Sequence, residues 1–99
     1  MGPVMTKVRA RPPLLIPQDE VIPLKRAVTI TGKSPDTIRG FHRKHCIARQ
    51  TSKNAPLEIS IVALQMVLHD DPEALELLHM GDRSHPRVVM YRRLVGLPD

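Results

Sequence analysis

The sequence predicts a mainly α-helical domain with one small β-hairpin wing, and three observations support this fold class. Between residues 24 and 95, apolar residues recur at spacings of three and four, as on the buried face of a helix. Serine, aspartate and proline stand directly before these stretches, where they can cap or open a helix. Residues 46–59 instead hold short apolar runs on either side of a polar turn, which is typical of a hairpin.

Residues 1–20 are predicted to form a flexible, basic, proline-rich arm ahead of a single domain that spans residues 21–99. Four prolines preclude a regular helix there: Pro3, Pro12, Pro13 and Pro17. Three basic residues lie among them: Lys7, Arg9 and Arg11. An arm of this kind can follow phosphates or enter a minor groove. An inert tail remains the alternative.

The first helix is predicted to begin at Pro23, because a proline has no N–H that the first turn would leave without a partner. Gly32 follows its apolar stripe and can adopt the positive φ that ends a helix. The stripe consists of Leu24, Ala27, Val28 and Thr31.

A second helix is expected from Ser34-Pro35-Asp36 to about Lys44. These three residues supply a hydroxyl N-cap, a proline at the first helical position and an acid in the first turn. Two short helices joined by a tight turn that contains glycine predict a helix-turn-helix.

The second helix has two chemically different faces. Ile38 and Phe41 lie on the side that can pack against the first helix. The opposite side is basic and has a glycine gap; it consists of Asp36, Arg39, Gly40 and Arg43, with Lys44 at its margin. Arginine binds guanine O6 and N7, and a carboxylate accepts from cytosine N4 in the major groove. A solvated charged face is the alternative interpretation.

Residues 46–59 are expected to form a hairpin with short strands at Ile47 and at residues 57–59. Its tip, residues 49–54, is rich in turn-forming residues. A winged helix has its wing at this place in the chain, and Arg49 and Lys53 suit contact with phosphates or a minor groove. A merely solvated loop is the alternative.

Three further helices are expected after the hairpin. Ser60 caps the first, residues 61–69, whose surface is apolar nearly all round and so is either buried or an oligomer interface. The second follows Asp70-Asp71-Pro72 and ends near Gly81, and the third runs from Pro86 to about Gly96.

The two halves of the chain differ in charge. Residues 1–54 contain 11 Lys and Arg against 3 Asp and Glu, and residues 55–99 contain 4 against 7. The halves are thus +8 and −3, within a total of +5. A basic half favours a polyanionic partner, and an acidic half favours a scaffold or partner-binding role. A membrane is not expected as a partner, because a basic amphipathic helix with aromatic anchors is missing.

Catalysis and cofactors are not predicted. His42, His45 and Cys46 do not fit a zinc pattern, and no orienting acid can be placed beside them for a nucleophile. A single cysteine excludes an internal disulfide, and the sequence lacks an apolar signal segment. We therefore expect a cytoplasmic protein that is not an enzyme.

These features resemble the winged helix-turn-helix of the mercury-resistance regulator (MerR) superfamily, including the small phage-type excisionases. Thr37-Ile38-Arg39-Gly40-Phe41 stands where family members typically have Thr-Leu-Arg-Tyr-Tyr, and His45 stands in place of the family's glycine at the helix end. The other matching residues are Ile22, Ala27, Gly32, Ser34 and Ile47. The resemblance covers about a third of the chain.

The resemblance implies a bacterial or phage-encoded factor that binds repeated sites on double-stranded DNA, bends the DNA and directs an integrase to excise a mobile element. The chain lacks the long dimerising helix of MerR-type regulators, which favours this role over a small transcriptional regulator. A phage terminase small subunit, which assembles through its helices, is the third possibility. We expect copies to associate head to tail on DNA. The predicted DNA-binding residues are Lys25, Lys33, Ser34, Asp36, Thr37, Arg39, Gly40, Arg43, Lys44, Arg49, Thr51 and Lys53.

Overall fold

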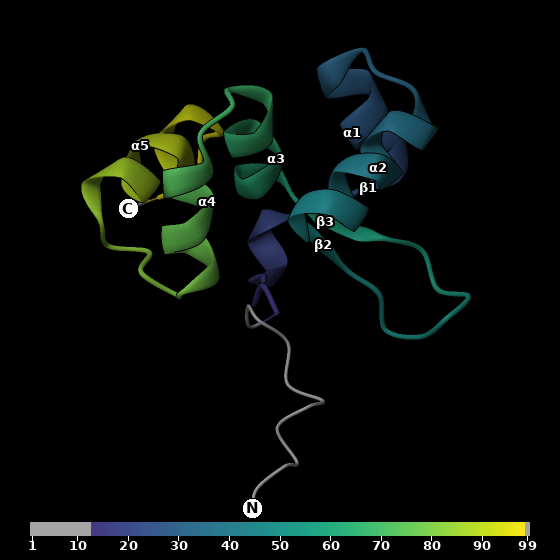
Figure 1. The fold of residues 1–99 in the computed structure, drawn as a ribbon, viewed down its shortest axis with the longest axis horizontal. Coiled ribbons are helices and arrows are strands. Elements are labelled where there is room, and N and C mark those ends of the chain that lie inside the picture. Colours follow the sequence, from purple (N-terminus) through teal and green to yellow (C-terminus); the bar gives the residue numbers. More distant parts are fainter. Residues whose placement is uncertain (1–12, 99) are drawn as a thin grey trace, which may run out of the picture.

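The computed structural model describes residues 13–98, which form five α-helices and a small three-stranded sheet (Figure 1). A short 3-10 turn, η2 (Gln18–Glu20), precedes strand β1 (Val21–Pro23). The remaining elements are α1 (Leu24–Thr31), α2 (Pro35–His45), β2 (Ala48–Arg49), β3 (Glu58–Ser60), α3 (Ile61–Leu68), α4 (Pro72–His79) and α5 (Pro86–Leu94). The predicted class, mainly helical with a β-hairpin, is confirmed at this level.

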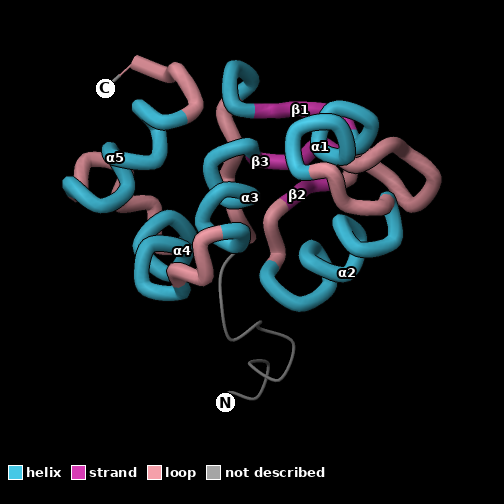
Figure 2. Tube along the Cα trace, turned by 90° about the horizontal axis from the view of Figure 1, so that it is seen from above, coloured by secondary structure: helices cyan, strands magenta, loops and turns pink. Residues whose placement is uncertain are grey.

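The sheet is antiparallel and has the order β1-β3-β2, as Figure 2 shows from above. The predicted hairpin is present, with Ala48 opposite Ile59 and Arg49 opposite Glu58. Strand β1 was not predicted. It has three residues and pairs with a segment far along the chain, Val21 with Ser60, so a local pattern does not reveal it. Pro23 is both the end of β1 and the N-cap of α1.

The hydrophobic core is built from small and branched aliphatic side chains. Helix α1 packs against β1, β3 and α2, and α3 packs against α4 and α5. Ala27, Ile38 and Ile59 are fully buried on the side of the sheet, and Leu64 and Met66 of α3 are fully buried at the centre. The continuous apolar surface of α3 is therefore explained largely by burial within one chain.

The prediction that residues 13–20 belong to a flexible arm is wrong. Leu14 and Ile16 are 4 % and 5 % exposed and are part of the core, and Glu20 is fully buried. Prolines exclude a helix but do not prevent an extended segment from packing on a neighbouring surface. Residues 1–12 of the predicted arm lie outside the described residues.

Glu20 ties the N-terminal segment to the C-terminal helices. Its carboxylate accepts hydrogen bonds from the Ser60 hydroxyl, at 2.5 Å, and from the Arg83 guanidinium. Arg92 Nη1 lies 3.7 Å from the same carboxylate. Because charges removed from water need partners, this cluster fixes η2 against the start of α3 and against α5.

Asp71 organises the contact between α4 and α5. It caps α4 by accepting from the Ala74 N–H at 3.1 Å, and it accepts from the Tyr91 hydroxyl at 2.8 Å and from Arg87 Nε at 3.1 Å. Burial alone would raise the pKa of Asp71, but the hydrogen bonds from Arg87, Tyr91 and Ala74 outweigh it and lower that pKa. Burial, followed by the bond to Asp71, raises the pKa of Tyr91 to about 12.

Candidate nucleic-acid interface

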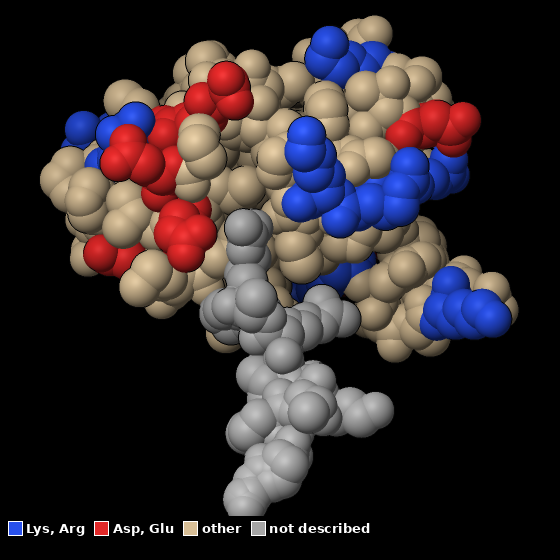
Figure 3. All heavy atoms as spheres, in the orientation of Figure 1, with Lys and Arg blue, Asp and Glu red and all other residues tan. Residues whose placement is uncertain are grey.

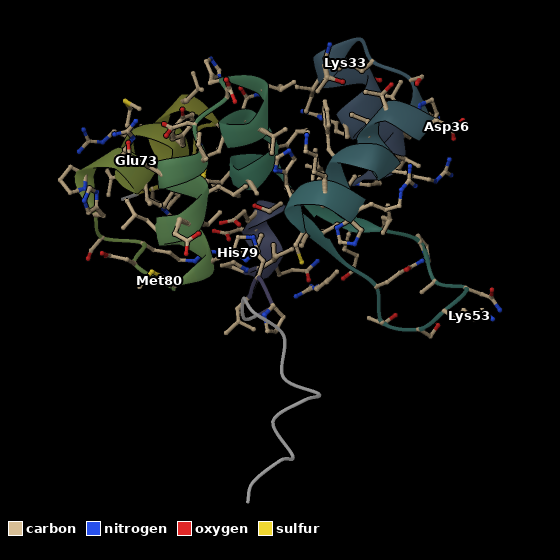
Figure 4. All side chains as sticks on the ribbon, viewed as in Figure 1. Lys33, Asp36, Lys53, Glu73, His79 and Met80 are labelled. Carbon is tan, nitrogen blue, oxygen red and sulfur yellow. The ribbon has the colours of Figure 1, made fainter. Side chains whose placement is uncertain are left out.

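The turn between α1 and α2 has the local chemistry that the sequence predicts. Gly32 ends α1 with a φ of 71°, and its N–H donates to the Val28 carbonyl at 2.8 Å. The Ser34 hydroxyl accepts from the Thr37 N–H at 3.2 Å and so caps α2. Three residues thus separate two helices that pack against each other, and Lys33 stands on the exposed turn (Figure 4).

Helix α2 buries one face and exposes the other, as predicted. Ile38 is fully buried, whereas Arg39 and Arg43 are exposed one turn apart on the opposite side. Gly40, which is partly buried, lies between them; a Cβ added there would come no closer than 3.6 Å to Arg43 Nη2. The backbone at this position would therefore accept a side chain. Because Gly40 has none, the middle of this face is flat.

Asp36 and Arg39 of the exposed face form an ion pair that the sequence pattern did not predict. Arg39 Nη1 lies 3.3 Å from Asp36 Oδ1, and their side chains are 50 % and 95 % exposed. A pair this exposed is weak, at about 0.2–1 kcal/mol. Arg39 can therefore leave Asp36 for a stronger anionic partner.

The loop between β2 and β3, residues 50–57, projects from the sheet beside α2 (Figure 1). Gln50 Nε2 donates to the Ala55 carbonyl at 2.6 Å and closes the loop on itself. Thr51 and Lys53 are exposed on it, and Lys53 lies at its far end (Figure 4). The loop carries a positive charge away from the body of the domain.

The predicted position of Arg49 at the hairpin tip is wrong. Arg49 is the last residue of β2, and its guanidinium is used inside the fold. Nε donates to Glu58 at 2.5 Å and Nη1 donates to the Ile16 carbonyl at 2.8 Å, while Nη2 lies 3.4 Å from Gln18 Oε1. The sequence could not show this role, because both acceptors of the N-terminal segment are more than thirty residues away.

The structure brings most of the predicted DNA-binding residues together but separates Lys25. The turn and α2 present Lys33, Ser34, Asp36, Thr37, Arg39, Gly40, Arg43 and Lys44, and the loop presents Thr51 and Lys53. Lys25 lies at the opposite end of α1, about 9 Å of helix away from the turn. Figure 3 shows Lys and Arg gathered over α2 and the loop, and Asp and Glu mainly over α4.

Apart from Arg39, which pairs with Asp36, the basic residues of this face have no carboxylate partner in the described part of the chain. Among residues 13–98, no ion pair with Asp or Glu is formed by Lys33, Arg43, Lys44 or Lys53. The acidic helix α4 differs, since Glu73 contacts Arg87 at 3.4 Å while its side chain remains 78 % exposed. The surface over α2 therefore offers unneutralised positive charge to an anionic partner.

His42 is a residue of this region that the predicted DNA-binding set lacks. It is partly buried on α2, and its Nδ1 accepts from the Ala48 N–H at 3.1 Å, which joins α2 to β2. Burial lowers the pKa of His42. Only the pairing of α2 with the hairpin reveals this role. Within the described part of the chain, no group of three or more His, Cys, Asp and Glu residues is arranged to hold a metal ion.

Helices among residues 13–98 are too short or too polar to cross a membrane. Comparison with protein-family models, with curated proteins and with solved structures finds no match to this chain.

Proposed function

We propose that this protein is a sequence-specific DNA-binding protein of the winged helix-turn-helix type, with α2 as its recognition helix. The observation that supports this most is the exposed basic face of α2, which follows a three-residue turn and lies beside a projecting loop. The major groove admits one helix, and a flat, basic face allows close approach to base edges.

The residues divide into those that read bases and those that contact the backbone. Arg39 projects from the middle of α2 and can bind guanine, and Asp36 can accept from cytosine N4. Arg43 is exposed one turn further along the same face, in the last turn of α2. Lys33, Lys44 and Lys53 surround them and suit phosphates. The loop that carries Thr51 and Lys53 would occupy the neighbouring minor groove. The protein acts by binding, without a catalytic step or a cofactor.

Within this class we favour an excisionase-like role: the protein binds repeated sites in the cytoplasm of a bacterium, bends the DNA and directs an integrase to excise a mobile element. The support is the resemblance of residues 22–47 to that family together with the basic face. A small MerR-like transcriptional regulator is the alternative within the same class, because both would use α2 in the same way.

Several copies would bind adjacent repeats and contact one another head to tail. One helix reads few base pairs, so neighbouring copies multiply the specificity through effective concentration. Glu73 and Glu76 are exposed on α4, and Lys25 and Arg26 are exposed on α1. Contacts between these unlike surfaces extend along DNA instead of closing as a twofold dimer.

An assembly protein of the terminase small-subunit kind is a second candidate, favoured by one observation. Helix α5 exposes Met90 and Leu94, at 54 % and 58 %, one helical turn apart. Rings that form without DNA and bind a terminase large subunit would support this candidate.

The salt dependence of binding tests the proposal as a whole. Affinity for duplex DNA should fall steeply with salt, with a log–log slope of about −0.9 for each phosphate neutralised. Lys53→Ala should make the slope shallower by about 1. Arg49→Ala should mainly lower the melting temperature, because Arg49 donates to Glu58 and to the Ile16 carbonyl within the fold. Affinity that does not change with salt would contradict DNA binding.

Footprinting on the ends of an element that also encodes an integrase tests the specific role. Protected repeats and excision that depends on the protein would support an excisionase, and protection of a promoter alone would favour the regulator. Sedimentation with DNA of increasing length should show a stepwise rise in bound copies. A fixed pair of copies at every length, or a stable dimer without DNA, would contradict the head-to-tail arrangement.

A further inference from the structure

A groove of about 710 Å³ is lined by residues from the C-terminal half of α2 and from strand β2. Its described lining includes His42 and two arginines, Arg43 and Arg49, and contains no acidic side chain. Arg49 is neutralised by Glu58, whereas Arg43 has no carboxylate partner among residues 13–98. The groove therefore offers an anion one uncompensated guanidinium.

His42 supplies a second donor to the same groove. Its Nδ1 accepts from the Ala48 N–H at 3.1 Å, so this nitrogen bears the lone pair. Burial lowers the pKa of His42, which favours the neutral ring. A neutral ring that accepts at Nδ1 has its proton on Nε2. Nε2 has no hydrogen-bond acceptor within residues 13–98, and the ring lines the groove.

The geometry of duplex DNA determines which part of the DNA would lie over this groove of the protein. A major groove and the adjacent minor groove are separated by one sugar-phosphate strand. If α2 lies in the major groove and the loop bearing Lys53 lies in the adjacent minor groove, that strand crosses the space between α2 and the hairpin (Figure 1). His42 and Arg43 both line the groove in that space, and no hydrogen bond from His42 Nε2 or from the Arg43 guanidinium is formed among residues 13–98.

We propose that His42 Nε2–H and the Arg43 guanidinium together bind one backbone phosphate of the DNA strand that passes between α2 and the hairpin. This inference rests on the proposed function and adds a defined phosphate contact to it. The C-terminal end of α2 has partial negative charge, which disfavours an anion, but Arg43, Lys44 and the fixed N–H of His42 lie in the same turn and oppose that effect.

Two substitutions separate the proposed contact from the structural role of His42. In His42→Asn the amide oxygen can take the place of Nδ1 and accept from Ala48, but the donor at Nε2 is lost. In His42→Gln the amide nitrogen reaches the place of Nε2, but the acceptor for Ala48 is lost. We expect His42→Asn to melt like the wild type and to bind DNA about tenfold more weakly. We expect His42→Gln to keep most of its affinity and to melt at a lower temperature.

The experiment measures affinity on a short duplex, selected by the protein from a random pool, in which single phosphates are replaced in turn by neutral methylphosphonates. One replacement should weaken wild-type binding about tenfold. The same replacement should weaken His42→Asn and Arg43→Ala much less, because each variant has already lost one of the two donors to that phosphate. Arg93→Ala on α5 serves as a charge-matched control and should retain the full sensitivity of the wild type.

The outcomes are distinguishable. If no single methylphosphonate weakens the wild type by more than about twofold, the phosphate contact is overturned, even if the variants fold poorly. If His42→Asn and the wild type respond alike at every phosphate, the contact is also overturned while DNA binding stands. If the wild type selects no duplex at all, the proposed function itself fails.

Discussion

The two halves of the molecule use arginine in opposite ways. In the C-terminal half, Arg83 and Arg92 lie against the buried Glu20, and Arg87 binds Asp71 and Glu73. On α2, Arg43 has no carboxylate partner among the described residues, and Arg39 has only an exposed one. The same side chain fixes helices in one half and leaves its charge available in the other.

This difference shows that the net charge of a segment is a poor guide to how much of its positive charge is unpaired. The four arginines after residue 54 are outnumbered by acids, but at least three of them are bound to carboxylates within the fold. The +8 of residues 1–54 is not all available over α2, because Arg49 is paired with Glu58 and because Lys25 and Arg26 lie on α1. Unpaired, exposed charge is the physically relevant quantity.

The largest effect should come from Glu20, whose loss would leave Arg83 and Arg92 without their buried counter-charge. Glu20→Gln should lower the free energy of unfolding by about 3 kcal/mol, because breaking a buried ion pair leaves an uncompensated charge. Urea unfolding followed by circular dichroism measures this. Glu76→Gln, on the exposed side of α4, is the matched control and should change stability by less than about 0.5 kcal/mol. Equal losses for both variants would contradict the structural role of Glu20.

On the basic half, Arg39→Ala should cost about 1–3 kcal/mol of binding free energy on the specific site and little on random DNA, if Arg39 reads a base. Its partner sharpens the test: Asp36→Asn removes a negative charge from the same face and should strengthen binding to random DNA. Competition titrations with both DNAs give the two affinities. An equal loss on both DNAs for Arg39→Ala would make Arg39 a backbone contact.

Tyr91 should make the acidic half sensitive to alkaline pH. Its pKa is raised from 10.0 to about 12 in the folded protein, so the unfolded chain loses this proton first. The stability that the Tyr91 hydroxyl contributes is therefore fully present below pH 10 and is lost as the pH rises from 10 towards 12. Tyr91→Phe should cost about 1 kcal/mol at neutral pH through the lost bond to Asp71. The variant should also lack this part of the alkaline decline in urea titrations. If the stability of Tyr91→Phe declined as steeply as that of the wild type, the alkaline decline would come from other groups.

The smallest effect concerns the junction between α2 and β2. Cys46 ends α2 with a φ of 57°, a conformation that costs a residue with a side chain about 1 kcal/mol. Cys46→Gly should raise the free energy of unfolding by about 0.5 kcal/mol, since glycine also gains freedom in the unfolded chain. Cys46→Ala keeps the Cβ and is the matched control. If Cys46→Ala were more stable than Cys46→Gly, the backbone at Cys46 would not be strained.

The sequence by itself determined the helices and their ends, because caps and periodic stripes act within a few residues. Ser34, Gly32 and Ser60 take the positions expected of them, and the face of α2 that includes Arg39 and Arg43 is exposed as predicted. It also determined the existence of the hairpin, from short apolar runs around a polar turn.

Only the tertiary structure decided which charged side chains remain available, because a partner across space leaves no mark in a local pattern. Arg49 contacts Ile16 and Gln18, 33 and 31 positions away, and Glu20 binds Arg83, 63 positions away. Strand β1 exists only through its pairing with β3. The αL residue after α2 is Cys46, one position after His45, which stands in place of the family's glycine. His42 is a candidate phosphate contact only because the Ala48 N–H of the hairpin donates to its Nδ1, which places the ring proton on Nε2.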